Sequence, residues 1–406
     1  MHRLAGIVGI FLSTFVVLAA AVTVTAAPAG QSPTPGPVGQ GPTPVPSSQG
    51  SGLTLNLTAG NGSGVVAHNF FLGDGAVPPR AGTYFGSAVR VAVGTTVTWT
   101  GGSDEPHTVT FLAGKPVPPL VVPQPEDPFG RPPMFNPEFF GPSPLSGPWD
   151  GSTLVNSGEL SQGEKFSLTF SREGTYPYLC LFHPDSMTGT VLVAASGPLT
   201  TQATIDQAVA THMSAVHDAQ ASLINSMRNT AGVADGPNGT QVWTARAGTE
   251  WHNGHLDIMA FMPSDVTIRQ GDTVVWYADQ NAPHTVTFKG DDNVLTDFIM
   301  VQMADGSMMS MDMMAGPPPP AAGPPDLATM PRFVVGPGTQ PIKASPTHDG
   351  HSTYNSGLFG LHGNAPVGPG APNTWSLTFD VPGAYQYTCV LHESLGMKGS
   401  VVVLPR

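Results

Sequence analysis

The stretch that decides the fold is WSLTFDVPGAYQYTCVLHESLGMKGSVVV, residues 375–403. Its apolar runs alternate with polar residues or are rich in β-branched residues, and Pro and Gly separate them, which is typical of short strands. Between the last two runs lies one short loop that carries Cys389, His392 and Met397. The sequence therefore predicts a β fold in which a thiol, an imidazole and a thioether share one loop.

The same pattern occurs earlier in the chain as FSLTFSREGTYPYLCLFHPDSMTGTVLV, residues 166–193. Three upstream blocks recur in the same order, namely VAVGTTVTW (91–99) with VTIRQGDTVVW (266–276), EPHTVTF (105–111) with APHTVTF (282–288), and Asn-Ser-Gly at 156–158 with 355–357. An internal repeat of this length indicates two similar domains rather than a short-period solenoid.

Each repeat supplies one Cys, two His and one Met as candidate metal ligands. They are His107, Cys180, His183 and Met187 in the first repeat, and His284, Cys389, His392 and Met397 in the second. Two His and one Cys in a trigonal plane, with a weak axial Met, form a known electron-transfer site for copper. The sequence therefore predicts one copper site in each repeat.

These motifs resemble the cupredoxins of the plastocyanin and pseudoazurin type. The second repeat matches their Cys-x2-His-x4-Met loop, with Tyr-x-Tyr-x-Cys before it and Gly-x-Val-x-Val after it. In the first repeat the His–Met spacing is one residue shorter and Pro184 follows the His, while the amicyanin loop in the same family is shorter still. The resemblance implies two type 1 copper ions held by the eight residues above, one-electron transfer, and His183 and His392 as the electron ports.

The expected fold is all-β, with two tandem cupredoxin-like Greek-key β-sandwiches of antiparallel strands joined by an α-helical linker. The expected domains are 53–196, with a Pro-rich insertion at 113–150, and 240–406, with a Met/Pro-rich insertion at 291–350. The linker covers 200–230, where five apolar residues recur at helical spacing: Ile205, Val209, Val216, Leu223 and Met227. Insertions of this length are usually functional lids or disordered segments.

The N-terminal region indicates export. Residues 1–27 carry His2 and Arg3 before an uncharged, mostly apolar run, and small residues near 24–27 suit cleavage of a signal peptide. The run is also long enough for a retained membrane anchor. Residues 28–52 are rich in Pro, Gly, Ser and Thr and are expected to form a disordered spacer. We therefore expect an extracellular, periplasmic or membrane-anchored protein outside the cytoplasm.

Composition limits the partners. The 406 residues contain 49 Gly and 43 Pro and only 11% charged residues, which favours strands, turns and long loops over a helical bundle. The formal net charge of −13 argues against nucleic acid as a partner and would suit a basic redox protein. The oligomeric state stays open.

Three alternatives to an electron carrier remain at this point. Cys180 and Cys389 could form a disulfide, as export permits, although their near-identical settings favour one role performed twice. Copper sequestration or delivery is the second alternative, because seven Met residues within 300–314 could bind Cu(I). For this segment we favour an apolar loop or a partner surface.

The third alternative is an enzyme like a multicopper oxidase or a copper nitrite reductase. Those enzymes connect a catalytic copper to the blue copper through His residues beside the Cys, whereas here Leu179, Leu181, Thr388 and Val390 flank the cysteines. A catalytic copper could still be assembled at a subunit interface from the remaining histidines. We interpret these as surface residues: His68, His212, His217, His252, His255, His348, His351 and His362.

Overall fold

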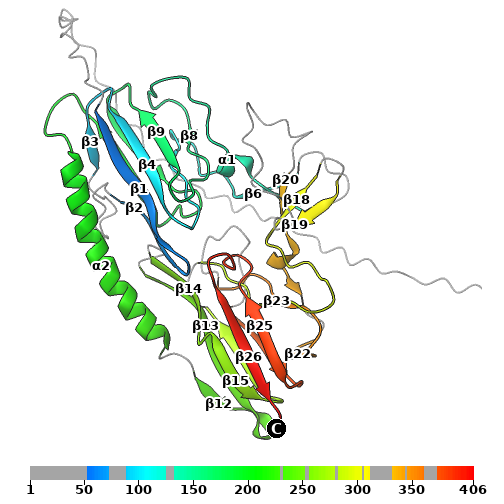
Figure 1. Cartoon of the computed structure of the whole chain (residues 1–406). Helices are drawn as coiled ribbons and strands as arrows, with labels where there is room; N and C mark the ends of the chain where they lie inside the picture. The colour runs from blue at the N-terminus through cyan, green and yellow to red at the C-terminus, as the bar shows by residue number, and fades with distance from the viewer. Residues whose placement is uncertain are drawn as a thin grey trace, which may run out of the picture. The chain divides into compact units, whose positions relative to one another are not determined.

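In the computed structural model, the described residues are 53–72, 88–124, 132–228, 232–251, 256–278, 282–303, 306–310, 332–342, 345–360 and 373–406 (Figure 1). The predicted signal peptide or anchor (1–27) and the spacer (28–52) lie outside them. Every described residue belongs to the compact unit Gln49–Arg406.

The first half of the chain is a β-sandwich. One of its sheets contributes four strands in the order β2 (Val66–Leu72), β1 (Thr54–Ser63), β4 (Thr96–Ser103) and β9 (Lys165–Thr169). The facing sheet has the order β3 (Val89–Val91), β11 (Thr188–Val193), β10 (Gly174–Leu179), β5 (Thr110–Phe111) and β8 (Val155–Asn156). Alternate residues of β3 and β9 point inward, as the sequence pattern requires, and both sheets contribute to one core around Trp99.

The second half repeats this arrangement. Its first sheet has the order β22 (Thr347–His348), β24 (Thr374–Phe379), β16 (Thr273–Tyr277), β13 (Gln241–Trp251) and β14 (Leu256–Met262), with β12 (Val233–Asp235) also paired to β13. The facing sheet has the order β15 (Asp265–Arg269), β26 (Lys398–Leu404), β25 (Gly383–Thr388), β17 (Thr287–Phe288), β23 (Tyr354–Ser356) and β21 (Pro341–Ile342). The two cores also match, because Trp276 meets Phe288 edge-on at 5.7 Å between ring centroids, and Trp99 meets Phe111 likewise at 5.8 Å.

The expectation of purely antiparallel sheets is wrong. The pairs β1–β4 and β3–β11 run parallel in the first half, as do β13–β16, β15–β26 and β22–β24 in the second. None of these pairs is joined by a tight hairpin, so no short turn forces its strands to run in opposite directions. The result in both halves is an all-β sandwich of mixed sheets.

The two halves share a sheet. Strand β2 of the first half pairs antiparallel with β14 of the second, with Val66 opposite Ile258, Ala67 opposite Asp257 and His68 opposite Leu256. This pairing makes one continuous ten-stranded sheet from the two smaller ones. We call this pairing the joint.

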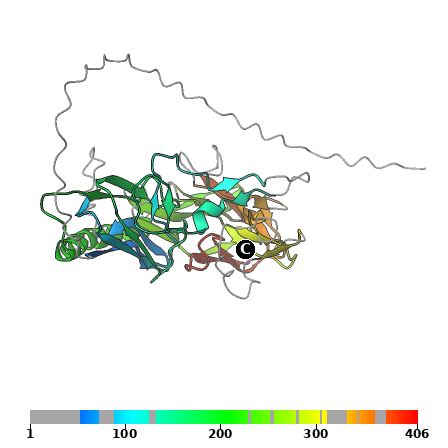
Figure 2. The same ribbon diagram turned by 90° about the horizontal axis from the view of Figure 1, so that it is seen from above.

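Helix α2 (Gln202–Arg228) spans this joint rather than serving only as a linker. Thr201 Oγ1 accepts a hydrogen bond from the Thr204 N–H at 3.2 Å and so caps the first turn. The predicted apolar face is confirmed: Ile205 joins the first core, while Val216 and Met227 pack against Leu256 and Ile258 of β14. Figure 2 shows α2 end-on beside the strands of the first half. Among the described helices, none has the length and hydropathy of a membrane span.

The two insertions meet in a small sheet of their own. Its strands, in order, are β19 (Met308–Ser310), β18 (Ile299–Gln302), β20 (Arg332–Val335), β7 (Met134–Phe135) and β6 (Val121–Val122). Among the described residues, the remaining short elements are α1 (Pro137–Phe140) and 3₁₀ turns at Pro237–Gly239 and Pro337–Thr339. Val334 of the second insertion pairs with Met134 of the first, so the described parts of both insertions are ordered by each other.

Candidate metal centres

The two cysteines lie at equivalent places in the two sandwiches. Cys180 directly follows β10 and Cys389 directly follows β25, and each thiol is fully buried in the core of its own half. Both are free thiols, so the alternative of a Cys180–Cys389 disulfide is wrong.

In the first half, the structure brings together three of the four predicted ligands. The Cys180 Sγ lies 3.9 Å from His107 Nδ1 and 3.6 Å from His183 Nδ1. His107 belongs to the segment before β5, whereas His183 lies on the loop between β10 and β11. The ligand atoms of all three residues lie within 4.8 Å of one another, which is close enough for one ion to bind them together.

The second half repeats this geometry. The Cys389 Sγ lies 3.9 Å from His284 Nδ1 and 3.4 Å from His392 Nδ1, and these three residues form the second group within 4.8 Å. In both halves the two imidazoles present the same ring nitrogen to the sulfur. The repeat in the sequence is therefore a repeat of the site.

Main-chain hydrogen bonds close both ligand loops in the same way, although one loop is a residue shorter. The Cys180 N–H donates to the Met187 carbonyl at 2.9 Å, and the Met187 N–H donates to the His183 carbonyl. In the second loop the Cys389 N–H donates to the Met397 carbonyl, and the Met397 N–H to the His392 carbonyl, both at 3.1 Å. The shorter loop of the first half thus keeps its methionine beside its cysteine.

Met187 and Met397 are fully buried in the two cores. Each lies on the ligand loop with its main chain hydrogen-bonded to that of the cysteine, and a type 1 copper site takes a Met as its fourth, weak ligand. Their role as axial ligands remains a prediction from the resemblance.

The donor set suits a metal that binds thiolate. Each sulfur accepts a main-chain hydrogen bond, from the Thr108 N–H at 3.3 Å and from the Thr285 N–H at 3.4 Å. Burial opposes ionisation, but hydrogen bonds with His107 and His183 lower the pKa of the Cys180 thiol to about 5. The charge of His392 and the hydrogen bonds with both imidazoles likewise hold the pKa of Cys389 well below its usual range. Two thiolates that are ionised near neutral pH and flanked by imidazole nitrogens fit a copper ion.

In the first half, the side chains of Ser103 and Glu105 form hydrogen bonds with the Nε2 atoms of the two ligand imidazoles. Ser103 Oγ donates to the Glu105 carbonyl and accepts from His107 Nε2 at 2.8 Å, which leaves His107 Nδ1 free to bind a metal. His183 Nε2 donates to Glu105 Oε1 at 3.2 Å. Neither residue was predicted from the sequence. The one signal in the sequence for Glu105 is that it stands where the second repeat has Ala282.

The pKa values of three ionisable residues near the first centre and the joint are shifted. Burial opposes it, but the charge of His183 and its hydrogen bond lower the pKa of Glu105 to about 2. Burial alone would lower the pKa of His183, yet the Glu105 carboxylate and the thiol hold it well above its usual range. At the joint, burial and then the charge of Glu105 raise the pKa of Asp257 well above its usual range. Glu105 is therefore the ionised carboxylate next to the first centre.

The Asn-Ser-Gly segments of both repeats support the strand that directly follows the upstream His. Asn156 Oδ1 accepts from Thr110 Oγ1 at 2.8 Å, and Ser157 Oγ accepts from the Val109 N–H at 2.8 Å. In the second half Asn355 accepts from Thr287 at 2.8 Å, and Ser356 accepts from the Val286 N–H at 2.8 Å. This motif is therefore structural and fixes the strand next to each upstream ligand.

Two of the histidines interpreted as surface residues are buried instead. His68 lies between β2 and α2, and its ring is 6.3 Å from that of His217. His348 stacks on Tyr354 and Phe379 in the second core. Their neighbours in space come from distant parts of the chain, so sequence spacing could not show their burial. His217 and His351 are exposed and His212 is half-buried, while His252, His255 and His362 lie outside the described residues.

The described part of the Met-rich segment supports apolar packing. Met300 lies in a small cluster with Met134 and Val334, while Met308 is exposed and Met303 and Met309 are half-buried. The remaining methionines of the segment, Met311, Met313 and Met314, lie outside the described residues.

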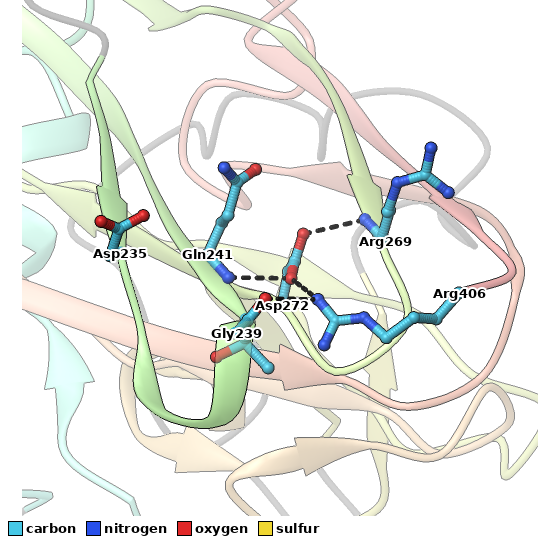
Figure 3. A pocket seen from close by; sticks show the side chains of 7 residues that line it. Asp235, Gly239, Gln241, Arg269, Asp272 and Arg406 are labelled. Atoms are coloured by element: carbon cyan, nitrogen blue, oxygen red, sulfur yellow. Dashed lines mark hydrogen bonds and ion pairs between the residues drawn. The ribbon is translucent and has the colours of Figure 1, made fainter.

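A pocket at the far end of the second half does not belong to the metal centres. It is lined by Asp235, Gly239, Thr240, Gln241, Arg269, Asp272 and Arg406 (Figure 3). Asp272 is buried and accepts from the Gln241 N–H at 2.9 Å, the Arg269 N–H at 3.0 Å and the Arg406 guanidinium at 2.9 Å. Strand β26 runs from Lys398, beside Met397, to Leu404, so this charged pocket lies one strand length from the ligand loop. Its hydrogen bonds to Asp272 hold the chain segments around the pocket together.

Comparison with known families gives a match in each half. Residues 81–194 and 363–404 match the model of the copper binding proteins of the plastocyanin/azurin family. The first match contains His107, Cys180, His183 and Met187, and the second contains Cys389, His392 and Met397. None of the curated proteins compared with the chain matches it.

Several solved structures are similar to parts of the chain. An oxidised amicyanin variant is 26% identical, with 26% of this chain and 68% of amicyanin covered and a TM-score of 0.17. The purple cupredoxin from Nitrosopumilus maritimus is 22% identical, with 34% and 99% covered and a TM-score of 0.17. Oxidised plastocyanin from Dryopteris crassirhizoma is 17% identical, with 40% and 99% covered and a TM-score of 0.19.

Proposed function

We propose that both halves of the chain are cupredoxin-type domains, since part of each half matches the copper binding proteins of the plastocyanin/azurin family, and that the protein is an exported carrier of single electrons with one type 1 copper site in each half. One observation carries the proposal. In each half a buried cysteine sulfur faces the Nδ1 atoms of two histidines, and the three ligand atoms lie within 4.8 Å of one another.

The protein's own residues supply what such a site needs. Cys180 and Cys389 provide thiolates, because the surrounding imidazoles and main-chain N–H groups favour the ionised sulfur. His107, His183, His284 and His392 provide the ring nitrogens, and Met187 and Met397 the axial thioethers. A copper ion held by these ligands would supply a reversible one-electron couple.

Rigidity of the ligands supports a carrier. The upstream histidines and the cysteines are fully buried and are anchored by strands of one sandwich, so these ligands have little freedom to move when the charge at the site changes. Such a site would need little reorganisation on gaining or losing an electron.

The setting outside the cytoplasm and the partner are part of the proposal. The apolar N-terminal run supports export or membrane anchoring, and the net charge of −13 supports a basic redox protein as the electron donor or acceptor.

Spectroscopy on the purified, copper-loaded protein tests this function. A carrier gives an intense thiolate-to-copper absorption and a reversible potential, and it consumes neither oxygen nor nitrite in the presence of an electron donor. A colourless protein that binds several Cu(I) ions would instead support sequestration or delivery. Consumption of oxygen or nitrite would support an enzyme with a further copper at a subunit interface.

A further inference from the structure

Glu105 occupies a position that has no equivalent in the other half of the protein. It precedes Pro106-His107 in the first repeat, whereas Ala282 precedes Pro283-His284 in the second. Its side chain is only 14% exposed, and that of its partner His183 is 17% exposed. A carboxylate held this far from solvent beside a predicted ligand needs an explanation that the repeat itself does not supply.

The contact with His183 determines how that imidazole is presented. Glu105 Oε1 accepts a hydrogen bond from His183 Nε2 at 3.2 Å, so the proton is on Nε2. The other nitrogen, Nδ1, lies 3.6 Å from Cys180 Sγ and is the atom that would bind a metal in place of a proton. Carboxylate partners of this kind fix the tautomer and the orientation of histidines that bind metals.

The second half offers an internal comparison, because its equivalent ligand His392 lacks such a partner among the described residues. No carboxylate of these residues accepts a hydrogen bond from His392, whose Nδ1 faces Cys389 Sγ at 3.4 Å. Ala282 stands where the first repeat has Glu105.

On the basis of the proposed function, we propose that Glu105 is a positioning residue for the first metal centre: its carboxylate orients His183 by the hydrogen bond from Nε2. A negative charge near a metal centre favours the more positive oxidation state. The centre of the first half, whose ligand His183 is hydrogen-bonded to a carboxylate, then has the lower potential of the two.

Two substitutions at Glu105 separate the hydrogen bond from the charge. Glu105→Gln removes the charge but keeps an acceptor for His183 Nε2, whereas Glu105→Ala removes both. The matched control is Glu173→Gln, the same change at an exposed glutamate beside the opposite end of β10 from Cys180. Each variant is made in a Cys389→Ser and in a Cys180→Ser background, so that each protein holds one copper whose midpoint potential is measured alone.

The expected results differ between the two centres. At the second centre the two Glu105 variants give the same potential as each other, because no hydrogen bond of His392 is lost there. At the first centre Glu105→Ala raises the potential further than Glu105→Gln, by about tenfold in the ratio of reduced to oxidised copper, which is about 59 mV for one electron. Glu173→Gln leaves both potentials unchanged. Equal first-centre potentials in Glu105→Ala and Glu105→Gln would overturn the positioning role.

A measurement on the metal-free protein keeps this inference separate from the proposed function. Nitrogen NMR of the His183 ring reports which nitrogen carries the proton. At a pH high enough to leave the His183 ring neutral, we expect the proton on Nε2 in the unmodified protein and in Glu105→Gln, and a mixture of tautomers in Glu105→Ala. A His183 ring that is the same in all three would overturn the positioning role, whether or not copper binds. Absence of the thiolate-to-copper absorption in the unmodified protein would count against the proposed function instead.

Discussion

At the scale of single residues, Gly60 shows how closely the chain packs around the first centre. Its φ is +69°, and a Cβ atom there would lie 2.1 Å from His107 Nε2. We predict that Gly60→Ala displaces His107 and abolishes or strongly alters the copper absorption of the first half, while that of the second half remains. Visible absorption and electron paramagnetic resonance measure this.

Gly94→Ala is the control for that substitution. Gly94 also has a positive φ, of +86°, but a Cβ atom there meets nothing within 4 Å. Both variants thus carry backbone strain of about 1 kcal/mol, and only Gly60→Ala collides with a ligand. Equal spectra for the two variants would show that His107 is not held against Gly60.

The ligands themselves could be predicted from sequence, because a Cys, two His and a Met recur in order in both repeats. Ser103, Glu105 and Gly60 could not be predicted, because each acts on an imidazole through a contact in space. Their residue types are common in loops, and no spacing distinguishes them from ordinary solvent-exposed residues.

At the scale of elements, buried hydrogen bonds tie the insertion of the second half to its core. Asn355 accepts from Thr287, and its Nδ2 donates to the carbonyls of Gly338 and Gln340 at 2.8 and 2.7 Å. We predict that Asn355→Ala lowers the free energy of unfolding by about 2–3 kcal/mol, because each buried polar group left without a partner costs about 1–3 kcal/mol. Urea unfolding monitored by tryptophan fluorescence measures the change.

The control for this loss is Asn225→Ala on the exposed face of α2, where alanine favours the helix and a change within about 0.5 kcal/mol is expected. If Asn355→Ala were as stable as Asn225→Ala, the network would not hold the insertion in place.

The packing of α2 on the joint should depend on pH. Burial lowers the pKa of His68 to about 4, against 6.5 for a free imidazole, and His217 and His212 on α2 lower it further while a hydrogen bond with Gln220 raises it. As the pH falls, the unfolded chain therefore binds a proton on this imidazole near pH 6.5, whereas the folded protein binds it only near pH 4. The stabilising effect is complete above pH 6.5 and is lost as the pH falls toward 4.

We predict that His68→Phe reduces the loss of stability of the metal-free protein between pH 7 and pH 4.5, measured by urea unfolding at both values. Part of the loss remains, because burial also lowers the pKa of His348 to about 4. His351→Phe, at an exposed position, is the control and should retain the full loss. An unchanged pH dependence in His68→Phe would contradict a neutral, buried His68.

Strands and the interdomain helix could be predicted because their periodicity is local. The parallel pairs could not be predicted, since strand direction depends on which distant segment lies alongside. The small sheet of the two insertions was not predicted for the same reason: β7 and β20 are each too short to be recognised alone, and their pairing joins distant parts of the chain.

At the scale of the whole molecule, the joint between β2 and β14 makes the two repeats parts of one sheet, so they are not independent domains connected only by a linker. The sequence predicts two similar domains, but it contains no signal for their pairing, because β2 and β14 are ordinary short apolar runs. Beside the joint, the turn of the first half at Gly64 lies close to Leu395 of the second ligand loop.

Counting copper in four proteins tests the central claim most directly: the unmodified chain, Cys180→Ser, Cys389→Ser and the double variant, each loaded with copper and dialysed. We expect two tightly bound copper ions per chain in the unmodified protein, one in each single variant and none in the double variant. The thiolate-to-copper absorption of the unmodified protein should equal the sum of those of the two single variants. Loss of both coppers from either single variant, or two coppers retained in the double variant, would contradict two independent cysteine-based centres.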